Sequence, residues 1–109
     1  NHMKLSEEQL NKIYNDLHNG ICYCGIRNNR GVGRIVYSPY TEMTLVQNYG
    51  STYVPNDKQE LKDCIEIFFS DEEDIVPAVY SEYHVNYIPA DNKYEAVDFS
   101  DYHPNVYGK

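Results

Sequence analysis

The 109-residue sequence predicts a single α+β domain, in which two helices accompany a mixed or antiparallel sheet of about five strands. Three observations lead to this fold class. The chain is long enough for one modest hydrophobic core but not for two. Two segments repeat apolar residues with helical spacing. The other apolar segments are short, rich in β-branched and aromatic residues, and separated by turn residues.

The first helix is predicted from Ser6 to Asn19. Ser6 and Gln9 have the spacing of a capping box, which satisfies free backbone N–H groups at a helix start. Gly20 then supplies the left-handed residue that commonly follows a helix end. One apolar face is formed by residues at helical spacing, namely Leu10, Ile13, Tyr14 and Leu17.

The second helix is predicted from about Asp57 to Phe69, with Asn56 as its N-cap and Gln59 at the third helical position. Its buried face is expected to contain Leu61, Cys64, Ile65 and Phe68. At ~100° per residue, three acids fall on one flank of this helix, namely Glu60, Asp63 and Glu66. The helix is therefore expected to be acidic on one side.

Three strands are predicted between the helices. The first two, Ile21 to Arg27 and Val32 to Tyr37, flank Asn28-Asn29-Arg30-Gly31, a favourable hairpin turn. We expect Gly31 to supply the positive φ that this turn requires. The third strand is predicted from Met43 to Tyr49, before the breaks at Gly50 and Pro55.

The carboxyl-terminal part predicts a second hairpin, with strands from Val79 to Ile88 and from Tyr94 to Phe99. Residues 103–109 are polar, and we expect them to be frayed. Asn1-His2-Met3 resembles a cloning scar before a start at Met3, so the domain is expected to span residues 4–109. The sequence has no apolar run that approaches the length of a membrane span.

The formal charge of −8 is concentrated in the second half of the chain. From Asp63 onward, eleven acids are opposed only by Lys93 and Lys109. Such a field disfavours direct binding of nucleic acid, which requires Lys and Arg to displace phosphate counterions. It also disfavours an anionic membrane surface and favours a basic protein partner, which long-range attraction would steer to the surface.

The cysteines and histidines do not predict a metal site or an enzyme. Cys22 and Cys24 are only two residues apart, and Cys64, His18, His84 and His103 are scattered, so no paired zinc spacing is present. The three cysteines are interpreted as buried thiols in a reducing cytosol, which predicts a cytoplasmic protein. Because no catalytic or phosphate-loop motif occurs, we predict a protein without enzymatic activity and without a cofactor.

Acids and tyrosines of the second half are the leading candidates for a partner-binding surface. Tyrosine is favoured at interfaces, and arginine both stacks on its ring and binds carboxylates. Four consecutive acids follow the second helix in the segment FFSDEEDIVP. The alternative interpretation is a solvated acidic face with core tyrosines. The candidate residues are Glu66, Asp71, Glu72, Glu73, Asp74, Glu82, Tyr83, Tyr87, Asp91, Tyr94, Glu95, Asp98, Asp101 and Tyr102.

The first hairpin offers a different hypothesis. Arg27, Arg30 and Arg34 occur within eight residues, beside Gly31 and Gly33. Guanidinium groups and glycine N–H groups could together hold a phosphate, as in a nucleotide-binding module. The simpler interpretation is a basic hairpin tip that offsets the acidic remainder, because the glycine spacing matches no phosphate-loop template.

In composition, the chain resembles small acidic phage-encoded anti-defence inhibitors, of which anti-CRISPR proteins and other DNA mimics are the nearest group. The segments DEED and YSEYHVNYIPADNKYEAVDFSDY carry this resemblance, which covers roughly the second half. It implies an inhibitor that occupies the DNA-binding cleft of a nuclease or CRISPR effector. An immunity protein for a basic toxin is a further alternative, and exposed tyrosines also leave a homodimer open.

Overall fold

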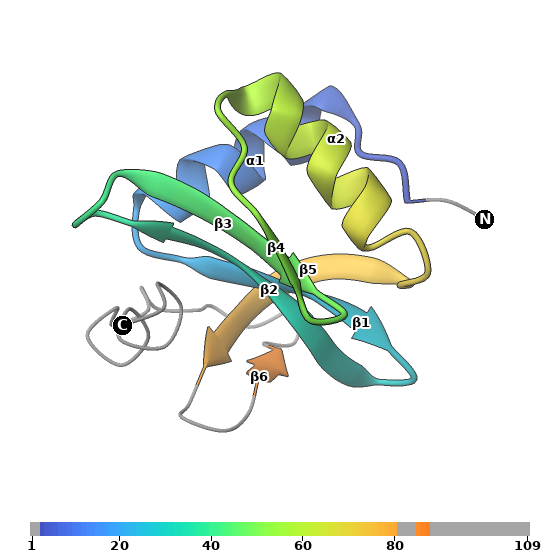
Figure 1. Ribbon diagram of the computed structural model, residues 1–109. Helices are drawn as coiled ribbons and strands as arrows, with labels where there is room; N and C mark the ends of the chain where they lie inside the picture. Colours follow the sequence, from blue (N-terminus) through green and yellow to red (C-terminus); the bar gives the residue numbers. More distant parts are fainter. Residues whose placement is uncertain (1–2, 81–84, 88–109) are drawn as a thin grey trace.

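A single antiparallel sheet carries both helices on one of its faces (Figure 1). The computed structural model describes residues 3–80 and 85–87. Each pair of neighbouring strands is antiparallel, and the order across the sheet is β4-β3-β2-β1-β5-β6. The predicted α+β domain with two helices is confirmed. The elements are α1 (Glu7–His18), β1 (Cys22–Arg27), β2 (Arg30–Ser38), β3 (Met43–Asn48), β4 (Ser51–Tyr53), α2 (Lys58–Phe68), β5 (Asp74–Tyr80) and β6 (Val85–Tyr87).

Helix α1 begins with the predicted capping box, because Gln9 N donates to Ser6 Oγ and Ser6 N donates to Gln9 Oε1. The helix ends at Asn19, and Gly20 follows with a φ of 86°. Leu10, Ile13 and Leu17 are buried and pack onto β1 and β2. Local capping and apolar spacing therefore agree with the tertiary packing.

Helix α2 begins one residue later than predicted. Its N-cap is Asp57, whose Oδ1 accepts from Glu60 N at 2.8 Å, and not Asn56. Asn56 instead donates its backbone N–H to Glu60 Oε1 at 2.9 Å. Leu61, Cys64 and Ile65 are buried against the sheet, as predicted for this face.

The turn between β1 and β2 is formed by two asparagines. Asn28 and Asn29 have φ of 52° and 63°, and Arg27 pairs with Arg30 across the two-residue loop. Two successive positive φ angles are typical of a type I′ turn, whose twist matches that of a hairpin. The expectation that Gly31 supplies the positive φ is therefore wrong, because asparagine tolerates the left-handed region.

Within the strands of this hairpin, Gly33 has a positive φ of 68° and lies in a β-bulge. Tyr23 pairs with Ile35 but Gly25 pairs with Val32, so β2 contains one extra residue in this interval. Gly25 and Gly33 both leave room for Phe69. A Cβ on Gly25 would lie 2.7 Å from Phe69 Cδ1, and a Cβ on Gly33 would lie 2.7 Å from Phe69 Cε1. The two glycines form a seat for this ring.

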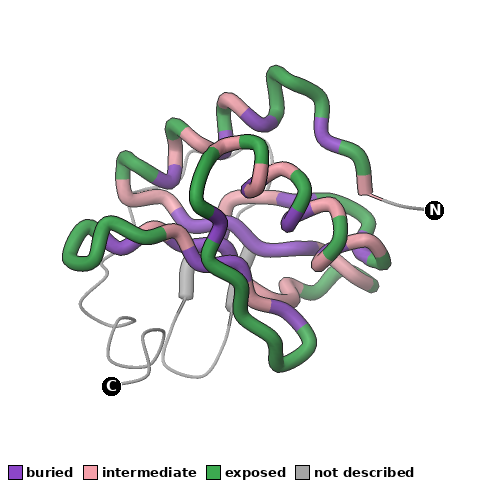
Figure 2. The backbone as a smooth tube through the Cα atoms, turned by 45° about the horizontal axis from the view of Figure 1, so that its top comes forward, coloured by how far each residue is buried: buried purple, intermediate pink, exposed green. Residues whose placement is uncertain are grey.

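Both faces of the central strands are buried. On the helix face, Tyr23, Ile35, Val46 and Phe69 belong to the main core. Alternate residues point to the opposite face, where Cys22, Cys24, Val36 and Leu45 are also buried. Figure 2 shows buried residues along the central strands and exposed ones in loops and on the outer helix faces.

The carboxyl-terminal strands differ from the prediction. Strand β5 begins at Asp74, five residues before the predicted start, because Asp74 and Ile75 already pair with Ile26 and Gly25. Strand β4 was not predicted. Strand β6 covers only part of the predicted Val79–Ile88 segment, and the predicted strand from Tyr94 to Phe99 lies outside the described residues.

Candidate functional site

The four consecutive acids after α2 do not share one environment. Asp71, Glu73 and Asp74 are exposed, whereas only 7% of Glu72 is exposed. The expectation that all four carboxylates face a partner is therefore wrong for Glu72. A buried carboxylate is stable only when its oxygens are hydrogen-bonded or paired with a cation.

Glu72 has such partners from two hairpins. Asn48 Nδ2 donates to Glu72 Oε1 at 2.9 Å, and Tyr49 Oη donates to Glu72 Oε2 at 2.9 Å. Arg27 forms an ion pair with Glu72 Oε2, and its guanidinium lies 5.2 Å from the centre of the Tyr49 ring. Glu72 therefore ties the loop after α2 to the β1–β2 and β3–β4 hairpins.

Further contacts fix the same loop. Phe69 is fully buried on the seat formed by Gly25 and Gly33. Asn48 Nδ2 also donates to the carbonyl oxygen of Phe68 at 2.9 Å, and Glu73 N donates to the carbonyl oxygen of Ile26 at 2.7 Å. The loop is thus held by a ring, a carboxylate and its backbone, so the backbone that carries the exposed acids has a defined position.

The exposed members of the acidic run make weak or local contacts. Glu73 Oε2 accepts from Asn28 N at 3.4 Å, which is long for a hydrogen bond. Asp74 Oδ1 accepts from the next residue, Ile75 N, at 2.8 Å. None of the ion pairs found within residues 3–80 includes Asp71, Glu73 or Asp74. These three carboxylates therefore carry negative charge into solvent, and Glu73 lies beside the hairpin tip at Asn28.

The Glu66 carboxylate makes contacts within the fold. Its Oε2 accepts from Leu5 N at 2.9 Å and lies 3.0 Å from Lys62 Nζ. The backbone N–H of Leu5, followed by Lys62, lowers the pKa of this carboxyl below its ordinary value. Glu66 therefore anchors the segment before α1 to α2, and the predicted acidic flank of α2 is reduced to Glu60 and Asp63.

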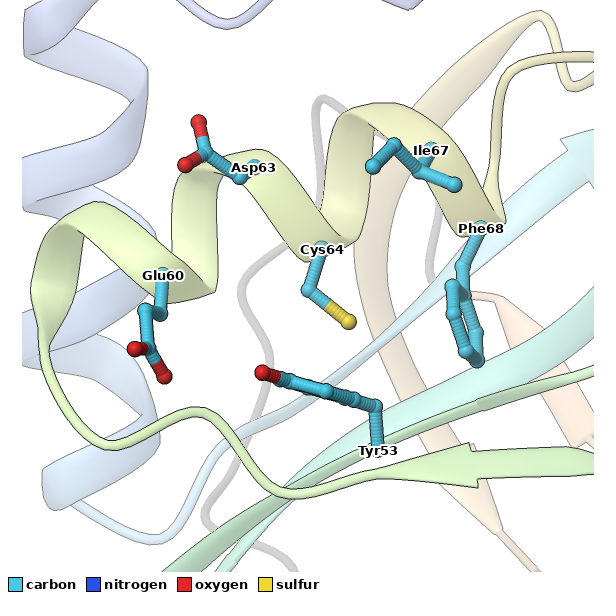
Figure 3. A pocket seen from close by; sticks show the side chains of 6 residues that line it. All are labelled: Tyr53, Glu60, Asp63, Cys64, Ile67 and Phe68. Carbon is cyan, nitrogen blue, oxygen red and sulfur yellow. The ribbon is translucent and has the colours of Figure 1, made fainter.

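Those two acids line a pocket between α2 and β4, with a volume of about 240 Å³ (Figure 3). Figure 3 shows the side chains of Glu60, Cys64 and Phe68 directed toward Tyr53, while Asp63 and Ile67 lie on the outer side of the helix. Ile67 is 70% exposed and Tyr53 is 44% exposed. The pocket therefore has an apolar wall that the Glu60 side chain faces, and Asp63 lies at its outer edge. Its lining is Tyr53, Glu60, Asp63, Cys64, Ile67 and Phe68.

The arginines of the first hairpin do not converge on one site. Arg27 is paired with Glu72 on the helix face of the sheet, and Arg30 is exposed at the hairpin tip. Arg34 lies close enough to Cys22, on the opposite face, to act against the rise in pKa that burial causes for that thiol. The space beside the neighbouring glycines, Gly25 and Gly33, is occupied by the Phe69 ring and is not open to a phosphate.

Part of the predicted surface falls outside the described residues. Tyr87 lies in β6, where the structure describes only the backbone. The other members outside the described residues are Glu82, Tyr83, Asp91, Tyr94, Glu95, Asp98, Asp101 and Tyr102.

The cysteines are buried, as predicted, and all three are free. Burial raises the pKa of Cys24 to about 12 and that of Cys64 to about 11, so both thiols are protonated near neutral pH. Within residues 3–80 and 85–87, no group of three or more His, Cys, Asp or Glu side chains could hold a metal ion. No helix in the same residues is long and apolar enough to cross a bilayer.

The residues that organise this surface are not among those that the sequence predicts. Asn48, Tyr49, Tyr53 and Ile67 were not predicted as site residues, although Asn48 and Tyr49 bind Glu72 and the other two line the pocket. One signal was available for Ile67, because it lies outside the apolar face predicted for α2 and yet is a large aliphatic residue.

No protein-family model, no curated protein and no solved structure matches this chain. The function is therefore inferred from the chain's own residues.

Proposed function

We propose that this protein is a non-enzymatic inhibitor that occupies the basic nucleic-acid-binding cleft of a nuclease or CRISPR effector. One observation carries the proposal: Asp71 and Glu73, on the loop that Phe69 and Glu72 hold in place, and Asp74, at the start of β5, are exposed. Exposed carboxylates that are close together in the chain present negative charge as the phosphates of nucleic acid do. Because the loop is ordered before binding, little conformational entropy is lost on association.

The overall charge supports the same class of partner. The formal net charge is −8, and acids already outnumber Lys and Arg among the described residues. Such a field repels nucleic acid and attracts a cleft lined by Lys and Arg, and this attraction raises the association rate. We therefore expect a protein partner, and no direct contact with nucleic acid or an anionic membrane.

The alternative of a phosphate- or nucleotide-binding module has less support. It requires Arg27, Arg30 and Arg34 to act together, but the charge of Arg27 is offset by Glu72. An immunity protein for a basic toxin nuclease would use the same carboxylates as the inhibitor proposed here. The identity of the partner separates these two functions, so a toxin nuclease belongs in the set of enzymes tested.

The experiment measures inhibition of DNA cleavage by a panel of guide-loaded CRISPR effectors and basic nucleases. Asp71→Asn combined with Glu73→Gln should weaken inhibition of the sensitive enzyme by at least about tenfold, since close interfacial charge pairs contribute ~1.5 kcal/mol or more. Glu7→Gln combined with Glu8→Gln is the matched control, because it removes two exposed carboxylates from the start of α1.

The control should inhibit as the wild type does. The proposal is wrong if no enzyme of the panel is inhibited, or if the two double variants weaken inhibition equally. Thermal unfolding should show that both variants are folded at the assay temperature, so that a change in inhibition lies in binding. The control should melt slightly lower than the wild type, because Glu7 and Glu8 lie in the first turn of α1.

A further inference from the structure

We infer that the pocket between α2 and β4 receives an arginine side chain of the basic partner. This inference rests on the proposed function, because the partner is the same, but it concerns a different patch of the surface. The pocket is distinct from the exposed carboxylates Asp71, Glu73 and Asp74, and none of its lining residues belongs to that loop.

The wall of the pocket suits a planar cation. The rings of Tyr53 and Phe68 both line the pocket, with centroids 6.5 Å apart and planes inclined by 59°. Cys64 lies beside Tyr53 and its thiol is protonated near neutral pH, since burial raises its pKa to about 11. A guanidinium group stacks on aromatic faces more readily than an ammonium group, because it is planar and more weakly hydrated.

The two carboxylates of the pocket lack a cationic partner. Glu60 Oε1 accepts from Asn56 N at 2.9 Å, and Asp63 Oδ1 accepts from Gln59 Nε2 at 3.0 Å, so both contacts are with neutral donors. The ion pairs found within residues 3–80 involve neither acid. Glu60 is directed toward Tyr53, whereas Asp63 lies at the outer edge of the pocket (Figure 3). An uncompensated carboxylate beside the two rings, with a second negative charge at the outer edge, is complementary to a guanidinium group.

The size and rim of the pocket indicate a protein side chain rather than a free small molecule. Its volume of about 240 Å³ is below the ~300–1,000 Å³ of typical small-molecule sites. Ile67, which lines the pocket, is 70% exposed, and β4 is the outermost strand of the sheet on this side. Apolar side chains around a buried cation are the arrangement found at the centre of protein interfaces.

A ligand titration followed by NMR tests this inference without the partner. The probe is Nα-acetyl-arginine methylamide, and the matched probe is the citrulline analogue, which has the same shape but no charge. The arginine probe should produce saturable shifts at the backbone amides of Tyr53, Cys64 and Phe68. The citrulline probe should bind at least about tenfold more weakly, since charge-assisted hydrogen bonds are roughly twice as strong as neutral ones.

Variants locate the site. Glu60→Gln combined with Asp63→Asn should abolish the saturable shifts while keeping the side-chain oxygens that accept from Asn56 and Gln59. Asp71→Asn combined with Glu73→Gln should leave them unchanged, because these acids do not line the pocket.

The inference is overturned by several results: equal binding of the citrulline probe, a preference for the equivalent lysine probe, or shifts outside the pocket. It is also overturned if the pocket amides shift on dilution of the protein alone, which would assign the pocket to a second copy of this chain. Failure of the pocket is distinguishable from failure of the proposed function. If only the pocket inference fails, inhibition of cleavage still depends on Asp71 and Glu73. If the proposed function fails, inhibition does not depend on these two acids.

Discussion

The segment at the end of α2 and the outer flank of the helix both contain acids and large apolar residues. These side chains are buried in the first region and exposed in the second. After the helix, Phe69 is fully buried and Glu72 is 7% exposed, and both hold the chain to two hairpins. Along the flank, Ile67 is 70% exposed, and Glu60 and Asp63 line an open pocket without a cation. The surroundings of an acid or a large apolar residue, and not its residue type, therefore decide whether it stabilises the fold or is exposed to a partner.

The largest effect is expected from matched truncations of the two apolar residues. Phe69→Ala should lower the free energy of unfolding by about 3–5 kcal/mol, since it empties the seat on Gly25 and Gly33. Ile67→Ala should change it by no more than about 0.5 kcal/mol, because the side chain is already solvated. Urea denaturation measures both values. Equal losses would contradict the division between a buried end and an exposed flank.

Alanine substitutions at two glycines test how closely Phe69 packs on the sheet. Gly33 and Gly50 have φ of 68° and 76°, so alanine costs about 1–2 kcal/mol at either site for the left-handed backbone. At Gly33, the new Cβ would also lie 2.6 Å from the carbonyl oxygen of Gln47 and 2.7 Å from Phe69 Cε1, which adds about 1–3 kcal/mol. No heavy atom lies within 4 Å of the equivalent position at Gly50.

Gly33→Ala should therefore be the more destabilising of the two substitutions in the same urea experiment. If Gly50→Ala is as costly as Gly33→Ala, the close packing of Phe69 on β2 is not what limits this position.

A smaller effect separates two neighbouring acids. Glu72→Gln should lower the free energy of unfolding by about 1–3 kcal/mol, because Arg27 loses its carboxylate and remains partly solvated. Glu73→Gln should change it by no more than about 0.5 kcal/mol, since Glu73 is exposed. Thermal or urea unfolding of the two isosteric variants gives the comparison. A larger loss for Glu73→Gln would reverse the assignment of the two carboxylates.

The smallest effect concerns pH. The backbone N–H of Leu5 and the charge of Lys62 lower the pKa of Glu66 in the folded state, below the ordinary ~4.3 of an unfolded glutamate. Its contribution to stability is therefore present above pH ~4.3 and is lost as pH falls through the folded pKa. The stability difference between wild type and Glu66→Gln should shrink between pH 7 and pH 3. A difference that is constant or grows as pH falls would contradict this.

Local signals in the sequence predicted much of the fold. The capping box at Ser6, the apolar spacing of both helices and the Asn28-Asn29 turn each depend on residues close together in the chain. Strand β4 escaped prediction because it has only three residues, all exposed. The start of β5 was not predicted because aspartate disfavours a strand, and the pairing of Asp74 with Ile26 overrides that preference.

The site was less predictable, because its decisive contacts join distant parts of the chain. Glu72 contacts Asn48 and Arg27, which are 24 and 45 residues away. No periodicity or spacing within the acidic run distinguishes Glu72 from Asp71 or Glu73. The same reason applies to the pocket, where Tyr53 comes from β4 and Ile67 from α2. Composition predicted a negative surface, and only the tertiary contacts separate the carboxylates that the fold uses from those left exposed.

Competition between this protein and DNA for one enzyme directly tests whether the protein occupies the DNA-binding cleft. The measurement is displacement of a fluorescently labelled duplex from the effector or nuclease that the protein inhibits, at several DNA concentrations. The proposed mechanism predicts that the protein concentration required for half-displacement rises in proportion to the DNA concentration once DNA is in excess. Half-displacement at the same protein concentration whatever the DNA concentration, or a complex containing both DNA and the protein, would contradict it.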